Sequence, residues 1–188
     1  MTNYDWANSI DAWTIAVSSH PDALLEAYGA EESLGPLTFF EAGALQGEAY
    51  PGLTFHVQLR QVGDYTVALE SNGWTGSVPQ VARRCSAGGH FFSVYWNVNT
   101  HGWLTEAKDG RITALFEALY PYHPYEVQSD TRPEWAIGPQ RELGSAYALC
   151  LAHLEAQTGV VVEQAWLGES MPTYRIGDPA VLYPDPWV

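Results

Sequence analysis

The sequence is organised around the consecutive runs YTVALES (65–71), NGWTG (72–76), SVPQVARRCSAGG (77–89) and HFFSVYWNVN (90–99). Between Tyr65 and Leu69, apolar residues alternate with other residues, which predicts a half-buried strand. Asn72-Gly73 ends this strand, because both residues tolerate the positive φ that a tight turn requires. The first run therefore predicts a strand that leads directly into a turn.

The rest of this stretch predicts a helix and a second strand. Ser77 followed by Gln80 is a capping-box pattern that begins a helix, and Gly88-Gly89 ends it. From Phe91 to Asn99 the alternation returns, with apolar residues on one face. A strand, a crossover helix and a strand form a βαβ-like unit, and a connection of this length permits parallel pairing.

The run NGWTGS, the short helix, SAGG and SVYWNVN together resemble a bacterial family that carries only a domain-of-unknown-function label. The resemblance extends over 64–117. It implies no activity, because no chemistry is assigned to that family. No catalytic or ligand-binding residue is carried over from it, so the functional argument rests on the residues themselves.

Two hairpins and a repeat are also predicted. Residues 53–60 pair with 65–69 across Val62-Gly63-Asp64, and 103–107 pair with 111–118 across Lys108-Asp109-Gly110, where Asp-Gly is the hairpin signal. WTIAVSS, from Trp13, matches YTVALES position by position, and a Pro-containing helix ending in Gly follows each run. A duplicated βα unit would explain this match.

Further elements complete the predicted domain. Thr38 with Glu41 is a capping-box pattern before a helix, 140–157 forms the strongest helix, and 160–162 adds a short edge strand. We expect a single α/β or α+β domain over 1–167, in which βα units and hairpins build a mixed sheet of about five to seven strands with helices packed on it. The inner strands are expected at 13–17, 65–69 and 92–98. The Pro- and aromatic-rich tail, 168–188, packs on the domain or binds a partner.

Charge and composition restrict the class of protein. Lys+Arg total 8 against 22 Asp+Glu, giving a formal net charge of −14, which disfavours nucleic acid and anionic membrane. The N-terminus shows no secretory signal and no apolar run approaches a membrane span, so we expect a soluble, cytoplasmic protein. Cys85 and Cys150 each lie on the apolar face of a predicted helix and are interpreted as buried thiols. The six histidines lack ligand spacing, so neither a metal nor a cofactor is expected.

The candidate binding residues are polar or aromatic side chains in and after the central stretch. Asn is poorly suited to strand interiors, so Asn97 and Asn99 beside Tyr95 suggest a polar face, with Glu70 and Trp74 near it. The competing interpretation is that both amides close backbone hydrogen bonds at the strand end. The turn at 73–77 occupies a strand-to-helix junction, but it matches no phosphate-binding motif and is interpreted as structural.

Two functional classes remain open. The first is a non-catalytic acidic module that binds a basic protein partner in an inhibitor- or immunity-like role, with Trp135 and Trp187 as anchors. The second is an enzyme or a small-molecule-binding protein that uses the face of Tyr95, Asn97 and Asn99. No recognisable catalytic set is present, which favours the first class. The sequence does not indicate the oligomeric state.

Overall fold

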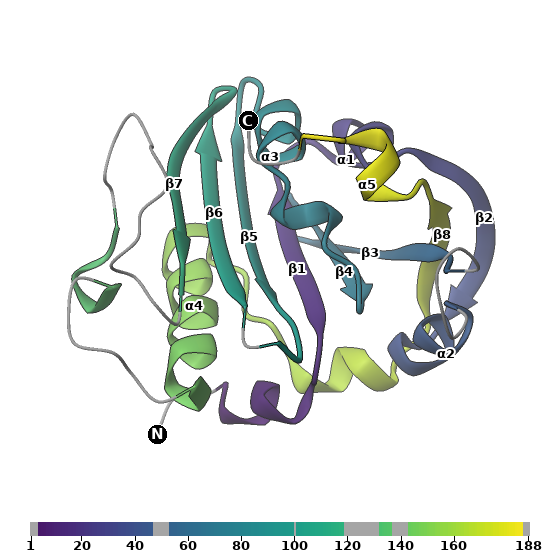
Figure 1. Ribbon diagram of the computed structural model, residues 1–188, viewed down its shortest axis with the longest axis horizontal. Coiled ribbons are helices and arrows are strands. Elements are labelled where there is room, and N and C mark those ends of the chain that lie inside the picture. The colour runs from purple at the N-terminus through teal and green to yellow at the C-terminus, as the bar shows by residue number, and fades with distance from the viewer. Residues whose placement is uncertain (1–3, 47–52, 100, 119–131, 137–142, 186–188) are drawn as a thin grey trace.

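A computed structural model describes residues 4–46, 53–99, 101–118, 132–136 and 143–185. The described residues form one eight-stranded sheet with the order β2-β8-β3-β4-β1-β5-β6-β7 (Figure 1). Every neighbouring pair of strands is antiparallel. The strands are β1 (Trp13–Ser18), β2 (Ala30–Leu37), β3 (Phe55–Val62), β4 (Tyr65–Ser71), β5 (His90–Trp96), β6 (Gly102–Lys108), β7 (Arg111–Glu117) and β8 (Met171–Ile176).

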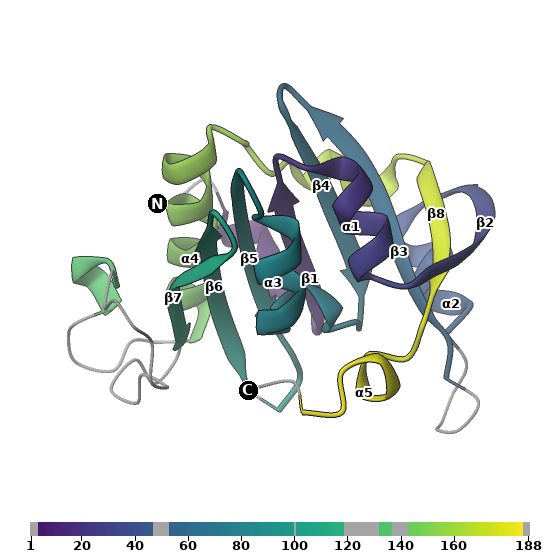
Figure 2. The same ribbon diagram turned by 90° about the horizontal axis from the view of Figure 1, so that it is seen from above.

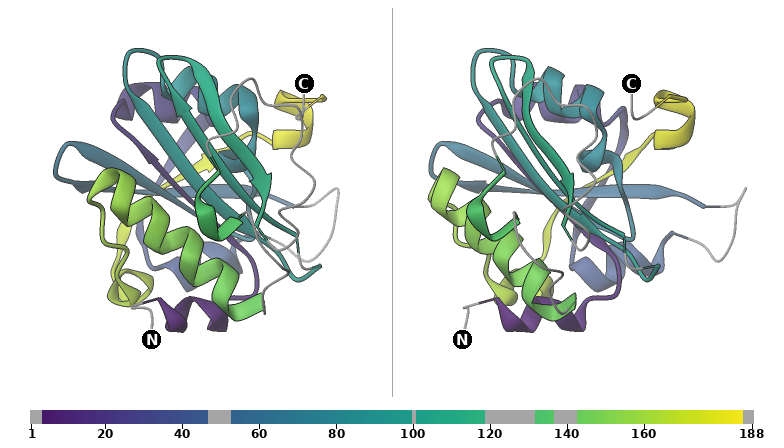
Figure 3. Two further views of the ribbon diagram at one scale, coloured as in Figure 1. Left: turned by 90° about the vertical axis from the view of Figure 1, so that its left-hand side faces the viewer. Right: turned by 60° about the vertical axis from the view of Figure 1, so that its left-hand side comes forward.

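Helices cover both faces of the sheet. The α-helices are α1 (Pro21–Ala27), α2 (Phe39–Ala44), α3 (Pro79–Cys85), α4 (Leu143–Thr158) and α5 (Pro179–Leu182). The 3-10 helices are η1 (Asp5–Ser9), η2 (Thr75–Ser77), η3 (Glu134–Ala136) and η4 (Gln164–Gly168). Helices α1 and α3 lie side by side on one face (Figure 2), whereas α4 lies against the opposite face (Figure 3). We call these the α1/α3 face and the α4 face.

Strand alternation distributes the core between the two faces. In β1, Trp13, Ile15 and Val17 point to the α4 face, where they are fully buried with Phe92 and Leu104. The intervening positions contribute to a second cluster on the α1/α3 face, whose fully buried members include Ala16, Ala68, Val81 and Phe91. A sheet that is apolar on both faces needs a layer of helices on each side, which explains the three-layer architecture.

The two predicted hairpins are present. Strands β3 and β4 pair with Val62 opposite Tyr65, and β6 and β7 pair with Lys108 opposite Arg111. Asp109 and Gly110 have φ of 50° and 76°, as a two-residue hairpin turn of the primed type requires. Strands β1, β4 and β5 lie inside the sheet, as predicted.

The sheet is antiparallel instead of mixed as predicted, and the predicted strand number is also wrong. Strand β1 lies between β4 and β5 and pairs with both in antiparallel fashion, so the βαβ-like unit has another strand inserted in it. The sheet has eight strands instead of five to seven because β2 and β8 pair with each other and extend it. Sequence patterning missed both strands, since β2 contains Gly35 and Pro36 and β8 begins with Met171-Pro172.

Several local predictions also change. Helix α3 begins at Pro79 and has Val78 as its N-cap, and the hydroxyl of Ser77 donates to the Trp74 carbonyl instead of capping the helix. By contrast, the capping box of Thr38 and Glu41 is formed at the start of α2. No strand occurs at 160–162. Residues 171–176, which belong to the predicted tail, form β8 within the sheet.

Candidate functional site

The Glu70 carboxylate lies at the centre of the stretch that dominates the sequence. Glu70 is at the end of β4 and is fully buried on the α1/α3 face. The backbone amide of Thr75 donates to Oε2 at 3.0 Å, and that of Gly76 donates to Oε1 at 2.8 Å. The hydroxyl of Thr14 on β1 donates to the Gly73 carbonyl at 2.5 Å. These bonds fix the NGWTGS turn against the sheet.

The glycines of this turn are required by close packing. A Cβ on Gly73 would lie 2.5 Å from Glu70 Oε2, and a Cβ on Gly76 would lie 2.5 Å from the Tyr28 hydroxyl oxygen. Neither separation is tolerated by real Cβ atoms, so any other residue would displace the turn. Close approach of the backbone to buried side chains therefore explains both glycines, Gly73 beside Glu70 and Gly76 beside Tyr28.

Burial dominates the electrostatics of this cluster. Desolvation raises the pKa of Glu70 from 4.5 to about 7, although the hydrogen bonds from the backbone amides of Gly76 and Thr75 act in the opposite direction. The pKa of Tyr28 is raised well above 10.0, first by its complete burial and then by the nearby Glu70 charge. A buried acid with a pKa near neutrality is typical of functional sites, and it also occurs where a carboxylate anchors a loop.

Tyr95 and Asn97 are adjacent to this cluster. Thr14 is paired with Glu70 on one side and with Tyr95 on the other, which places all three side chains in one row across the sheet. Burial raises the pKa of Tyr95, a hydrogen bond from Asn97 lowers it, and the Glu70 charge raises it further. The Asn97 amide donates to the Tyr95 hydroxyl at 2.6 Å.

The Asn97 side chain is used within its own hairpin. Its Oδ1 accepts from the backbone amides of Asn99 at 2.9 Å and His101 at 3.2 Å. These contacts match the interpretation in which the amide closes the end of the strand. Asn99 is exposed, in the turn after β5. The polar face is thus formed by Tyr95 and Asn97, with Glu70 buried beside it.

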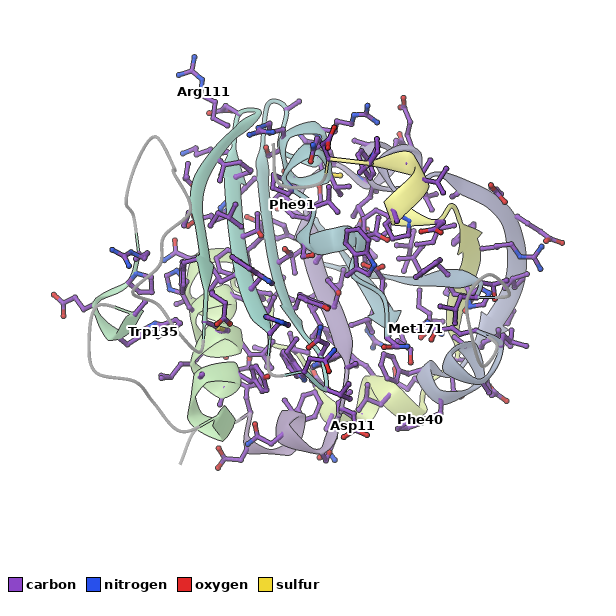
Figure 4. All side chains as sticks on the ribbon, in the orientation of Figure 1. Asp11, Phe40, Phe91, Arg111, Trp135 and Met171 are labelled. Carbon is purple, nitrogen blue, oxygen red and sulfur yellow. The ribbon has the colours of Figure 1, made fainter. Side chains whose placement is uncertain are left out.

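The three tryptophans proposed as binding residues do not form one site. Trp74 is half-buried and packs on the α1/α3 face. Trp135 lies in η3 (labelled in Figure 4). It packs on the core of the α4 face, where its ring contacts Phe116 edge-on with the ring centroids 5.9 Å apart. Trp187 lies outside the described residues. Trp135 therefore covers the core of the α4 face and is separated by the sheet from Glu70.

A second feature is an acidic hollow of about 320 Å³ between α1 and β2. Its walls combine three exposed glutamates with apolar and aromatic side chains: Leu25, Glu26, Ala30, Glu31, Glu32, Ser33 and Tyr174. Among the described residues, Arg175 pairs with Glu32 at 3.1 Å, and no cation pairs with Glu26 or Glu31. Adjacent Glu31 and Glu32 were visible in the sequence, but their position beside α1 depends on β2 and β8, which were not predicted.

The described part of the chain contains no group of three or more His, Cys, Asp or Glu side chains arranged to hold a metal ion. It also contains no helix that is both long enough and apolar enough to span a membrane. Cys85 and Cys150 are both buried free thiols, and they lie in the separate cores on opposite faces of the sheet.

The fold defines an α/β protein with an antiparallel sheet between two layers of helices. The chain belongs to the family described as a family of unknown function (DUF6461), whose model matches residues 3–174. The match includes β1 to β7 and most of β8, so it extends over nearly the whole sheet of this chain. Neither the curated proteins nor the solved structures include a match to this chain.

Proposed function

We propose that this protein is a non-catalytic acidic module that binds a basic protein partner, in an inhibitor- or immunity-like role. The observation that carries the proposal is the hollow between α1 and β2, where the carboxylates of Glu26 and Glu31 are exposed and have no cationic partner among the described residues. A lysine or arginine side chain of a partner is complementary to this hollow in charge, and Tyr174 in the wall offers it an aromatic surface.

The charge of the whole chain supports the same proposal. With a formal net charge of −14, the protein accelerates encounter with a basic partner through long-range attraction. The hollow lies beside β2, which is an edge strand of the sheet. Two register shifts, the positive φ of Gly35 and the missing N–H of Pro36 interrupt that edge, so regular strand addition is disfavoured. Contact through side chains is therefore the binding mode that we propose.

The test is capture of partners from the native host by the wild-type chain and by two variants of equal charge. Glu26→Gln combined with Glu31→Gln removes the hollow's unpaired charges. The matched control, Asp64→Asn combined with Asp109→Asn, removes two charges at hairpin turns elsewhere. We expect a basic protein whose binding weakens with salt, is lost in the first variant and persists in the control. Equal weakening in both variants, or binding that does not depend on salt, would contradict the hollow as the binding site.

A second candidate is the small-molecule-binding protein or enzyme that uses the Tyr95/Asn97/Asn99 face. The observation in its favour is the buried Glu70 beside Tyr95, with a pKa near neutrality. Against it, the polar contacts of Asn97 are all made within its own hairpin. Turnover of a small substrate that is lost in a folded Asn97→Ala variant would favour this candidate over the binding module.

A further inference from the structure

The hydrogen bonds of Glu70 all tie one turn to the sheet. Both carboxylate oxygens accept from backbone amides, one from Thr75 and one from Gly76, and the side chain is fully buried. Helix η2, which these amides begin, lies against β1, β5 and β6 and leads directly into α3. The placement of η2 on the sheet therefore depends on how well one carboxyl group accepts two hydrogen bonds.

The groups that face Glu70 are neutral. Tyr28 reaches it from the C-cap position of α1 and Tyr95 from β5, and burial raises the pKa of both tyrosines. Cys85 of α3 and Tyr183 after α5 act on Tyr28, and no lysine or arginine is among the main influences on Glu70. A fully buried carboxylate without a facing cation is stabilised only by amides and hydroxyls. Uptake of a proton is the usual relief for such a group.

We propose that Glu70 acts as a pH-dependent switch for the Thr75–Ser77 turn. The ionised carboxylate holds this turn on the sheet, and the protonated carboxyl group loosens it. In the ionised form each oxygen accepts one amide as a charge-assisted hydrogen bond. In the protonated form one oxygen carries a hydrogen, so it is a weaker acceptor for the N–H that faces it. One of the two bonds from Glu70 that fix η2 is thereby weakened.

The burial of the group places this transition near neutral pH. The pKa of Glu70 is about 7, above its ordinary value of 4.5. At a pH between these two values, the folded chain therefore keeps a proton on Glu70 that the unfolded chain has released. Global stability therefore falls as the pH rises through this window. The turn itself behaves in the opposite way, since its two amide bonds strengthen when the proton leaves.

The experiment is an NMR titration of the full chain between pH 4 and 9, with the Glu side chains labelled with ¹³C. We expect the Glu70 carboxyl carbon to titrate near pH 7 and the amide protons of Thr75 and Gly76 to shift with the same midpoint. Corrected for base catalysis, their hydrogen exchange should be faster below that midpoint. Glu41 is the internal control, because it accepts from the Thr38 amide at 2.8 Å but is exposed, and its pKa is lowered.

A Glu70 midpoint at or below 4.5, or amide protons that do not follow the carboxyl carbon, would overturn the proposal. The variant Glu70→Gln provides a second measurement, since glutamine has one acceptor oxygen and does not titrate. In the folded variant, the turn amides should exchange quickly at every pH. If the exchange of the turn amides still depends on pH in Glu70→Gln, the proposed switch is refuted. If the variant does not fold, the titration of the wild-type chain tests the proposal by itself.

Discussion

Substitution of Gly76 by alanine tests the close packing of the NGWTGS turn on the sheet. The new Cβ would lie 2.5 Å from the Tyr28 hydroxyl oxygen, 2.8 Å from Thr14 Cγ2 and 3.1 Å from Ala16 Cβ. These atoms belong to fully buried side chains of β1 and of Tyr28, the C-cap residue of α1, so none has room to move away. The backbone of the turn must move instead, and the Gly76 amide then leaves Glu70 Oε1.

Two contributions set the expected loss. Overpacking of a well-packed core costs about 1–3 kcal/mol. A lost hydrogen bond to a charged group costs about 1.5–3 kcal/mol more. The free energy of unfolding of Gly76→Ala should therefore fall by about 3–5 kcal/mol, which corresponds to a drop in Tm of roughly 6 °C or more for a chain of this size.

The assay is urea unfolding followed by circular dichroism, with Gly168→Ala as the matched control. A Cβ on Gly168 meets nothing within 4 Å and its φ is not in the left-handed region, so this variant should be neutral or more stable by up to about 1 kcal/mol. If Gly76→Ala has the same unfolding midpoint as the control, the packing argument is wrong.

Three further outcomes are expected. Asn97→Ala should lower the free energy of unfolding by about 1–3 kcal/mol because the hairpin loses its side-chain acceptor, and Asn97→Asp, which keeps that acceptor, should lose less in the same urea titration. Thr38→Ala should cost about 1 kcal/mol through loss of the capping box, again measured with urea. Cys85 and Cys150 should react with a thiol reagent at pH 8 only after unfolding, because burial raises the pKa of both thiols, to about 12 for Cys85. Both are free thiols, so the addition of reductant should not change Tm.

Local turn chemistry made the hairpins predictable from the sequence. Gly63 and the Asp109-Gly110 pair adopt positive φ, and each sits between runs of alternating residues. The pairing partner of such a strand is its neighbour in the chain, so no long-range information is needed. The same holds for the capping box of Thr38, where both partners lie within one turn of helix.

The order of the strands depends on contacts between distant segments, which single-sequence patterns do not contain. Insertion of β1 between β4 and β5 joins residues that lie between 48 (Ser18 and Thr66) and 83 (Trp13 and Trp96) positions apart. For the same reason the sequence identified Glu70 as a candidate but missed Tyr28, which reaches Glu70 from the C-cap position of α1. The acidic hollow was missed because Tyr174 enters its wall only through the pairing of β8 with β2.

The repeat noticed in the sequence has a counterpart in the geometry. When WTIAVS is aligned with YTVALE, Ala16 matches Ala68, and these two alanines are directly opposed in the β1–β4 ladder. A local two-fold axis between β1 and β4 requires this relation. Such an axis exchanges each residue of one strand with the equivalent residue of the other, and only the two residues beside the axis face their own equivalent. Helices α1 and α3 both begin with proline in the first turn and pack side by side on the same face.

The two repeated units, β1 with α1 and β4 with α3, also use equivalent residues at their strand ends in the same way. Ser18 aligns with Glu70, and each is the residue near the strand end that holds the connection to the following helix. Ser18 Oγ accepts from the His20 amide at 2.9 Å, two residues later, whereas Glu70 reaches the amides of Thr75 and Gly76, five and six residues later. The longer side chain is matched to the longer connection. Its length also brings an ionisable carboxyl group into the core, whereas the Ser18 hydroxyl at the equivalent position is not an acid.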